Sequence, residues 1–427
     1  MRESQLIEST FDRLWPICRS ILGPGYRASL DILAEVFPHE RLTFATGTRI
    51  LDWTVPQEWV PESAFLQTPD GRRVADFKTN NLHLLNYSQP FEGRLSKQEL
   101  REHVYTLPAQ PDAIPYVTSY YAPRWGFCLS QQEWDALPEG EYLASIQTRL
   151  VDGHLVVAEA VLPGASEKEI LFSSYLCHPS MANNELSGPL MLSFLYRRLA
   201  QKKNRKYTYR FAILPETIGS VALLSQRGAH FQKHLVAGYV LTCIGDGGKI
   251  SYKASRQQNS LADRAARAAL RSYDGARFYD FNPAVGSDER QFCSPGFNLP
   301  VGSFLRTLYT EYPEYHTSLD NKALMDFEKM SETLDYLEKT IAAVESNETW
   351  ENLFPHGEPQ LGPRGVFRTL SDKHRHADEI ALWWVLNYSD RQNDTLAIAE
   401  RAGLPFDTVA RVAEQLHAHG LLQRVAP

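Results

Sequence analysis

Apolar residues in the second half of the chain form short runs that alternate with stretches of helical spacing. Ile170–Leu176 is a mostly apolar run typical of a buried strand, and Pro179 marks its end. Apolar residues between Pro189 and Ala200 recur at helical spacing. Further β-prone runs begin at Tyr209, Gly238 and Phe297, and further helical stretches cover residues 258–273 and 326–346. Strands that alternate with helices predict an α/β core.

The first part of the chain predicts helices followed by a separate β-rich unit. Residues 4–37 show helical spacing, with a Gly23-Pro-Gly break between two helices. Residues 46–125 contain short β-prone runs, many aromatic residues and turn signals, which predict an inserted small domain. Residues 140–163 predict an antiparallel hairpin of the core with its turn at Asp152-Gly153. Antiparallel strands beside parallel ones would give a mixed sheet.

The carboxyl-terminal segment has the pattern of a winged helix. Residues 349–365 are rich in proline and glycine and predict a linker or a strapped extension. Helices are predicted at 379–386, 395–402 and 406–419, with a short wing from Leu421. Arg411 has Asp407 and Glu414 close by in the sequence, and basic residues do not outnumber acidic ones in this segment. We therefore expect a protein partner or a homodimer contact here rather than nucleic acid.

Charge and composition narrow the class of protein. The 427 residues carry a formal net charge of −7, which argues against broad electrostatic binding of nucleic acid or anionic membranes. The first residues lack the order of a secretory signal, and no uncharged run reaches the roughly 18 residues of a membrane helix. Five scattered cysteines without a Cys-x-x-Cys pair predict reduced thiols. We expect a cytoplasmic protein without membrane contact.

Polar residues suited to metal chemistry follow the predicted strands. His178 ends the first run, Glu216 and Asp246 end the next two, and His316 comes late in the chain. A lone histidine of this kind is more often structural than catalytic. Four such groups in order are ligand types that Zn²⁺ accepts. Cys177 adjoins the first histidine, but strand alternation predicts that its side chain points away from it.

This order of residues resembles that of the co-catalytic zinc aminopeptidases, whose core is a mixed sheet flanked by helices. The resemblance implies His178, Asp246 and His316 as metal ligands and Glu216 as the general base. It also implies that Asp320, in a His-Thr-x-x-Asp segment, is the carboxylate that orients the last histidine. Zn²⁺ is the cofactor that the resemblance implies.

Two positions differ from the pattern of that family. Asn184 stands where the metal-bridging aspartate is expected, and Thr217 stands where the second glutamate of a Glu-Glu pair is expected. A one-residue gap would instead make Glu216 a ligand and leave no base. We expect one zinc per chain, or a rearranged site that recruits Glu185, rather than two metals.

The likeness extends to a bacterial family with an aminopeptidase-like core, a nested domain near the amino terminus and a carboxyl-terminal winged helix. Its signatures in this chain are Leu14-Trp-Pro-Ile-Cys-Arg, Asp52-Trp-Thr-Val-Pro, Ser119-Tyr-Tyr-Ala-Pro-Arg-Trp-Gly and the His178 loop. The implied organisation is core at 1–45, inserted β-rich domain at 46–125, core at 126–348 and winged helix at 365–427. The resemblance also implies a link to surface-polysaccharide or specialised-metabolite pathways.

Several further residues are candidates for binding a small-molecule or short-peptide substrate. Asn184 could stabilise an oxyanion, and Arg124 of the inserted domain could meet a substrate carboxylate or sugar. Glu185, Asp288 and Tyr309 are further candidates for contacts with the substrate. Each of these residues could equally be a buried or solvated structural group.

Three functions fit the sequence. The first is a zinc-dependent hydrolase that cleaves an amide or peptide bond, with the metal polarising the carbonyl and Glu216 accepting a proton. The second is a catalytically silent aminopeptidase-like module that binds a ligand or a partner, because two site positions are neutral. The third is a DNA-binding regulator that senses a small molecule.

Overall fold

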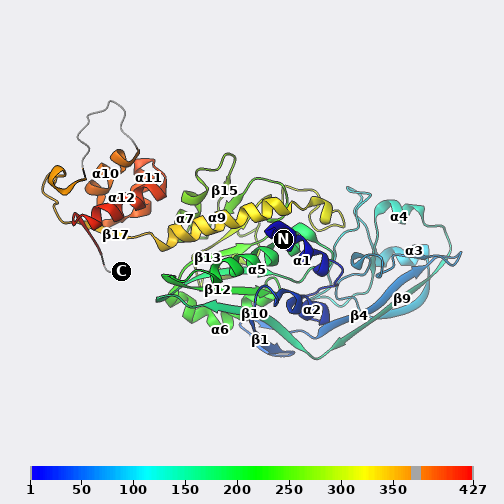
Figure 1. Ribbon diagram of the computed structural model, residues 1–427. Helices are drawn as coiled ribbons and strands as arrows, with labels where there is room; N and C mark the ends of the chain where they lie inside the picture. Colours follow the sequence, from blue (N-terminus) through cyan, green and yellow to red (C-terminus); the bar gives the residue numbers. More distant parts are fainter. Residues whose placement is uncertain (1, 367–376, 426–427) are drawn as a thin grey trace.

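An eight-stranded sheet forms the centre of the computed structural model, which describes residues 2–366 and 377–425 (Figure 1). Its strand order is β1-β10-β12-β11-β13-β16-β14-β15. The strands are β1 Glu40–Ala45, β10 His154–Leu162, β11 Ser166–Tyr175, β12 Tyr207–Leu214, β13 Leu235–Leu241, β14 Ser251–Lys253, β15 Arg277–Tyr279 and β16 Val301–Leu305. β12, β11, β13 and β16 run parallel, β1 and β10 pair antiparallel with their neighbours, and β14 pairs antiparallel with β16 and parallel with β15. The predicted mixed sheet is confirmed.

Helices cover both faces of this sheet because its strands are apolar on both sides. Phe172 and Tyr239 pack into one core and the adjacent Leu171 and Val240 into another, as strand alternation requires. The first core is covered by α1 Glu3–Leu14, α2 Pro24–Leu33, α5 Ser187–Ala200, α7 Leu261–Leu270 and α9 Phe327–Glu345. The second is covered by α6 Ile218–His234 and α8 Glu289–Phe292.

A second sheet belongs to the inserted domain, and its order is β5-β4-β9-β6. Its strands are β4 Glu58–Gln67, β5 Arg73–Val74, β6 Phe91–Ser96 and β9 Glu141–Val151. Smaller elements around it are β2 Arg49–Ile50, β3 Trp53–Thr54, β7 Val104–Tyr105, β8 Phe127–Cys128, α3 Lys97–Leu100 and α4 Gln131–Ala136. Short 3-10 turns lie at Asn81–His83, Arg101–His103, Lys322–Leu324 and Gly362–Arg364.

The predicted core hairpin at 140–163 is wrong. β9 pairs with β4 and β6, whereas β10 pairs with β1 and β12, so the turn at Asp152-Gly153 connects two different sheets. β4 supplies a longer partner for β9 than a hairpin with β10 would, since it pairs with β9 from Glu58 to Gln67. The sheet of the inserted domain therefore extends past the predicted limit at residue 125.

The carboxyl-terminal domain begins earlier than predicted. Residues 349–352, predicted as linker, form the central strand of a three-stranded sheet, where Trp350 is buried and donates to Oγ1 of Thr395 at 3.1 Å. The strands are β17 Thr349–Asn352, β18 Asp390–Asp394 and β19 Leu422–Arg424, and the helices are α10 Ala377–Tyr388, α11 Thr395–Ala402 and α12 Phe406–Ala418. Residues 367–376 and 426–427 of the predicted domain lie outside the described residues.

None of the helices in the described part of the chain combines the length and the apolar character that a membrane crossing requires.

Candidate metal centre

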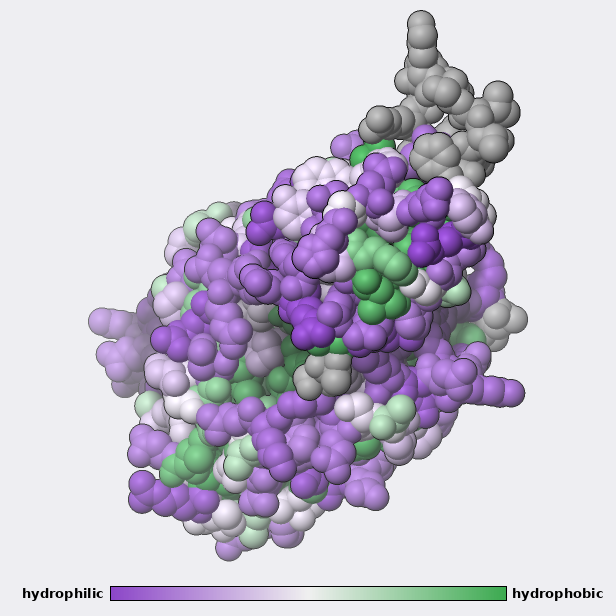
Figure 2. Space-filling view, turned by 90° about the vertical axis from the view of Figure 1, so that its left-hand side faces the viewer, coloured by the Kyte–Doolittle hydropathy of each residue, from purple (hydrophilic) through white to green (hydrophobic). Residues whose placement is uncertain are grey.

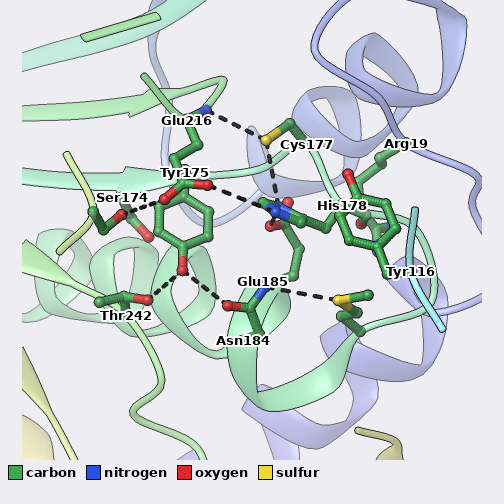
Figure 3. Close-up of polar contacts among 12 residues, drawn as sticks. Arg19, Tyr116, Ser174, Tyr175, Cys177, His178, Asn184, Glu185, Glu216 and Thr242 are labelled. Atoms are coloured by element: carbon green, nitrogen blue, oxygen red, sulfur yellow. Dashed lines mark hydrogen bonds and ion pairs between the residues drawn. The ribbon is translucent and has the colours of Figure 1, made fainter. Parts of the chain in front are cut away.

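Two parallel strands deliver the central pair of polar side chains. His178 follows the end of β11 and Glu216 follows the end of β12, so both leave the sheet at the same edge (Figure 3). Nε2 of His178 lies 3.6 Å from Oε2 of Glu216. This is longer than a hydrogen bond and close to the roughly 3.3 Å that separates two ligands of a tetrahedral zinc ion. The pair therefore brackets a space suited to one small cation.

The turn that carries Glu216 has a strained backbone and is stabilised by hydrogen bonds with a distant segment of the chain, residues 287–288. Thr217 has a φ of 62°, a left-handed conformation that costs a β-branched residue about 1–3 kcal/mol. Oδ1 of Asp288 accepts hydrogen bonds from the Thr217 amide at 2.7 Å and from Ser220 at 2.9 Å. Ser287 donates to Oε1 of Glu216 at 2.7 Å. Asp288 therefore fixes the turn, and the predicted role in binding substrate has no support in these contacts.

Asp288 is also a perturbed carboxyl group. Burial, followed by the charge of the neighbouring Glu216, raises the pKa of Asp288 to about 8. Its Oδ2 atom is buried and has no hydrogen-bond partner among the described residues. A protonated Asp288 at neutral pH would place no second negative charge next to Glu216.

The second nitrogen of His178 is fixed by a carboxylate. Nδ1 lies 2.7 Å from Oε2 of Glu185, and the Glu185 side chain is fully buried. Burial lowers the pKa of His178, but the adjacent Cys177 and Glu185 outweigh it and raise that pKa well above the usual value. Arg19 donates to the His178 carbonyl at 3.1 Å. The contact with Nδ1 means that Glu185 orients the histidine ring. The Glu185 side chain is not exposed to a substrate, so its prediction as a substrate contact is not supported.

Cys177 lies closer to the centre than strand alternation predicts. Its Sγ atom is 3.4 Å from Nδ1 of His178 and accepts from the Glu216 amide at 3.3 Å. Among the described residues, Cys177, His178 and Glu185 are the one group of three metal-capable side chains within 4.8 Å. Burial raises the pKa of the Cys177 thiol to about 12, so a thiolate ligand is unfavourable here. We infer that Cys177 and Glu185 hold the His178 ring in position and do not themselves bind the metal.

His316 brings a free nitrogen to the same place. Its ring centroid lies 5.4 Å from that of His178, and its φ is 57°. Its Nε2 atom is buried and finds no hydrogen-bond partner within the described ranges. Burial, with a contribution from His178, lowers the pKa of His316 to about 3. A neutral imidazole with an unused lone pair is the form that binds a metal.

The inserted domain forms a wall of this centre through Tyr116. Its ring lies beside that of His178, with the centroids 5.0 Å apart (Figure 3), and its centroid is 5.3 Å from that of His316. Its amide donates to the His316 carbonyl at 2.9 Å, and its hydroxyl contacts the Tyr120 hydroxyl at 2.8 Å. In the sequence, Tyr116 is one of the many aromatic residues of the inserted domain. The only signal was its position just before the Ser119 motif.

Asp246 does not join the two histidines. Its carboxylate accepts from the Gly248 amide at 2.6 Å, from Asn183 at 2.8 Å and from the Thr307 hydroxyl at 2.9 Å. β13 ends at Leu241, and the next residue, Thr242, is the one that reaches the site. Asp246 lies beyond this strand end and holds its own turn, so the prediction of a metal ligand is not supported.

Neutral side chains occupy the other half of the centre. The Tyr175 hydroxyl lies 2.5 Å from Oγ1 of Thr242 and donates to Oδ1 of Asn184 at 3.2 Å (Figure 3). Nδ2 of Asn184 donates to the sulfur of Met181 at 3.7 Å. Asn184 is therefore engaged with Tyr175, and the structure does not support its prediction as an oxyanion donor.

Asp320 orients the loop before α5 rather than His316. Its carboxylate accepts from the amides of Asn183 at 2.6 Å and Asn184 at 2.8 Å. These amides begin a π-helical turn, Ala182–Leu186, whose first N–H groups lack helical partners. Burial raises the pKa of Asp320 to about 6, although these amides oppose the shift. The expected bond to His316 is absent from the residues that the structure describes.

Close packing sets the position of this loop. Gly188, in the first turn of α5, lies so near β13 that an added Cβ atom would be 2.3 Å from the Leu241 carbonyl oxygen. The helix therefore approaches the strand end closely, and the π-helical turn just before it brings Asn184 and Glu185 to the site.

The two remaining predicted contacts lie away from the histidines. Arg124 is exposed, donates to the Thr118 carbonyl at 2.6 Å and sits over the ring of Tyr105. The Tyr309 hydroxyl accepts from Lys253 at 3.3 Å. Its ring lies 5.9 Å from that of Tyr315, which stacks on His316 at 3.9 Å.

The donor atoms suit one zinc ion and not two. His178 and His316 offer two imidazole nitrogens of the kind that zinc binds, and the Glu216 carboxylate lies 3.6 Å from Nε2 of His178. The unpartnered Nε2 of His316 supports this assignment. A second cation would face Asn184, Thr242 and Tyr175, which bring no negative charge.

Family models divide the chain as the fold does. A model described as a domain of unknown function, DUF4910, matches residues 8–347. The chain belongs to the DUF4910 family. A second model, described as a winged helix-turn-helix, matches residues 348–424 of this DUF4910 chain. This limit agrees with the start of β17 at Thr349.

Relatives of this DUF4910 chain include a protein from Clostridium acetobutylicum named as a putative polysaccharide biosynthesis protein with aminopeptidase-like domain. The two are 41% identical over 98% of this chain and 96% of the relative. A crystal structure of a putative peptidase from the same organism has a TM-score of 0.91 and 39% identity, covering 99% of this chain and 96% of that one. The predicted aminopeptidase-like family and fold are confirmed.

A zinc aminopeptidase from Bacillus subtilis shares the fold at 12% identity. Its TM-score is 0.58, and the match covers 79% of this DUF4910 chain and 94% of the aminopeptidase. A peptidase M28 precursor from Shewanella amazonensis matches with a TM-score of 0.54 at 11% identity, over 80% and 93% of the two chains. These matches show the core architecture.

Removing the carboxylate behind His178 should weaken metal binding. Glu185→Ala leaves Nδ1 of His178 without its partner at 2.7 Å. We expect zinc affinity to fall by about 10–100-fold, as for other carboxylates that orient a histidine ligand. Competition with a chromogenic chelator measures this affinity. Glu185→Gln, which keeps an acceptor oxygen, should retain most of it, and equal affinity in the alanine variant would contradict the role.

Proposed function

We propose that this chain is a metal-dependent hydrolase of the aminopeptidase-like class that cleaves an amide or peptide bond in a small substrate. His178 and His316 would hold one zinc ion, with Glu216 beside it. Two observations carry the proposal: Nε2 of His316 is buried and unpartnered with its ring 5.4 Å from that of His178, and Nε2 of His178 lies 3.6 Å from Oε2 of Glu216. A buried polar atom without a hydrogen-bond partner costs free energy unless a bound ligand or ion interacts with it.

The residues around the gap have distinct roles in this proposal. Zinc held there would polarise a substrate carbonyl and lower the pKa of a bound water. Glu216 would accept the proton, since its side chain is 27% exposed and therefore open to water and substrate. Ser287 holds one of its oxygens and leaves the other facing His178. Glu185 would keep the histidine ring in place.

The substrate is proposed to be small because the inserted domain closes the site. Tyr116 packs against both histidines, and Gln110 and Ile114 of the same segment bond to the loop that carries His316. The relative's name refers to polysaccharide biosynthesis. An amide-bearing sugar or an amino-acid conjugate is the substrate class that combines these two observations.

Glu216→Gln tests the role of the proposed base. We expect the variant to keep its zinc and to lose turnover of aminoacyl and acyl-amide substrates by about 10²–10⁴-fold, because glutamine cannot accept the proton. Zinc content and initial rates are measured on the same preparation, with the exposed Glu62→Gln as a matched control. Retained turnover would contradict the assignment, and loss of zinc would show that Glu216 is a ligand.

A silent binding module is the second candidate. It is favoured by the neutral Asn184 and Thr242, which leave the centre with fewer charges than a two-metal hydrolase uses. Zinc content separates the two proposals, because a silent module would hold no metal at His178 and His316.

For the winged helix we propose a protein contact rather than DNA binding. Arg411 of α12 donates twice to Asp378, at 2.9 and 2.7 Å, and Arg424 bonds to Glu414 at 2.6 Å. Basic side chains that are already paired within the domain are poorly placed to neutralise phosphates. Equal weak binding of unrelated duplexes at low salt, lost at physiological salt, is the expected result.

A further inference from the structure

A cleft separates the core from the winged helix, far from the histidines along the chain. Its volume is about 650 Å³, within the about 300–1,000 Å³ typical of small-molecule sites. Arg267, Arg271 and Phe278 line it on the core side, and Leu396, Leu404 and Phe406 line it on the winged-helix side. Figure 2 views the molecule from the winged-helix end, where hydrophobic side chains lie in a recess surrounded by polar ones.

The walls of this cleft are fixed relative to each other. Arg264 of α7 binds Asp394 through two hydrogen bonds of 2.8 and 2.6 Å, and Asn347 donates to the same carboxylate at 2.9 Å. The crystal structure of the relative superimposes over 99% of this chain with a TM-score of 0.91, which includes the winged helix. The cleft is therefore a feature of how the two domains pack.

Three arginines follow one side of α7 at helical spacing, and two of them lack an acidic partner. Arg264 is paired with Asp394 and lies 3.6 Å from Glu400. Arg267 donates to the Gln258 carbonyl at 2.8 Å, and Nη2 of Arg271 reaches the turn at Gly403. Neither Arg267 nor Arg271 has a carboxylate within ion-pair distance in the described part of the chain. Glu400, a carboxylate of the cleft lining, lies 3.6 Å from Arg264, so the charges of Arg267 and Arg271 are left to favour an anion.

Apolar side chains line the cleft on both sides, together with the Glu400 carboxylate on the winged-helix side. Phe278 is 45% exposed although it lies in the cleft, whereas Phe406 on the winged-helix side is buried. Exposed aromatic and aliphatic surface beside two guanidinium groups suits a ligand with both an apolar body and a negative group.

We propose that this cleft binds an anionic small molecule that carries an aromatic or apolar group. Its carboxylate or phosphate would lie between Arg267 and Arg271, and its apolar part would lie against Phe278 and Leu404. Such a ligand would contact both domains and stabilise their packing. This site is independent of the proposed metal centre, so either proposal can fail alone.

The test uses the fluorescent aromatic sulfonate 8-anilinonaphthalene-1-sulfonate as the probe on the full-length protein. We expect saturable binding that becomes at least tenfold weaker in the Arg267→Ala, Arg271→Ala double variant. Arg277→Ala is the matched control, since Arg277 precedes Phe278 but pairs with Glu311 at 2.7 Å. Leu404→Trp, which fills the cleft without changing charge, should also weaken binding. Circular dichroism and melting temperature confirm that each variant is folded.

Competition identifies the anionic group. Phenyl phosphate displacing the probe better than benzoate would indicate a phosphate ligand, and the reverse a carboxylate, whereas inorganic phosphate alone should displace little. Equal probe affinity in the wild type and the double variant would overturn the proposal. Absence of saturable binding in the wild type would overturn it as well.

Discussion

His178→Ala should reduce the zinc content of the purified protein from about one ion per chain to almost none. Nε2 of His178 faces the gap to Glu216, and the alanine variant would leave Glu185 buried without its partner. His316→Ala should have the same effect, because its Nε2 is buried without a hydrogen-bond partner and its ring lies 5.4 Å from that of His178. Metal content is measured by mass spectrometry on protein purified without chelator and then supplied with zinc.

Two further variants make this result specific. His154→Ala removes an exposed histidine at the start of β10 and should leave the zinc content unchanged. Cys177→Ser should also keep its zinc, because the buried thiol is not proposed as a ligand. Zinc retained in both His178→Ala and His316→Ala would place the metal elsewhere. A wild-type protein that takes up no zinc would favour the silent binding module.

Lys253→Met should lower the free energy of unfolding by about 3–5 kcal/mol, the cost of leaving one partner of a buried ion pair alone. Nζ of Lys253 lies 2.7 Å from Oε1 of Glu289, and the two side chains are 3% and 1% exposed. Nζ also bonds to the Val285 carbonyl and to the Tyr309 hydroxyl. Urea denaturation followed by circular dichroism measures the change.

Matched variants show whether the loss comes from the unpaired charge. Lys329→Met removes a half-exposed lysine that is 2.7 Å from Glu332, and should change stability by less than about 0.5–1 kcal/mol. Adding Glu289→Leu to Lys253→Met should recover part of the loss, since the buried carboxylate is then gone. A loss below about 1 kcal/mol in Lys253→Met would mean that water reaches Glu289.

Local patterns in the sequence were enough to predict the α/β class, the main site strands and the helices of the winged helix. The apolar run that ends in His178 and the one that ends near Glu216 were both predicted as strands, and the structure pairs them in parallel. The helix-turn-helix limits at 395–402 and 406–419 agree with α11 and α12 within one residue. These features depend on residues close together in the chain, where hydrophobic periodicity and turn residues carry the signal.

Features that depend on distant contacts were decided only by the tertiary structure. β9 pairs with β4 rather than with β10, its neighbour in sequence. The stability of a strand pair depends on the contacts between side chains across the two strands, which local sequence does not reveal. Thr242 rather than Asp246 reaches the centre, since the end of β13 is set by its parallel partners.

The chemistry of the centre was likewise decided by side chains that only folding brings together. Tyr116 arrives from the inserted domain, and Glu185 reaches Nδ1 of His178 through a π-helical turn. By itself the sequence determined the fold class and the pair His178 and Glu216. The three-dimensional packing decided which carboxylate orients the histidine. It also decided that the neutral side chains of Tyr175, Thr242 and Asn184 fill the second half of the site. The reason is that a shift of one residue in a turn changes which side chain faces inward.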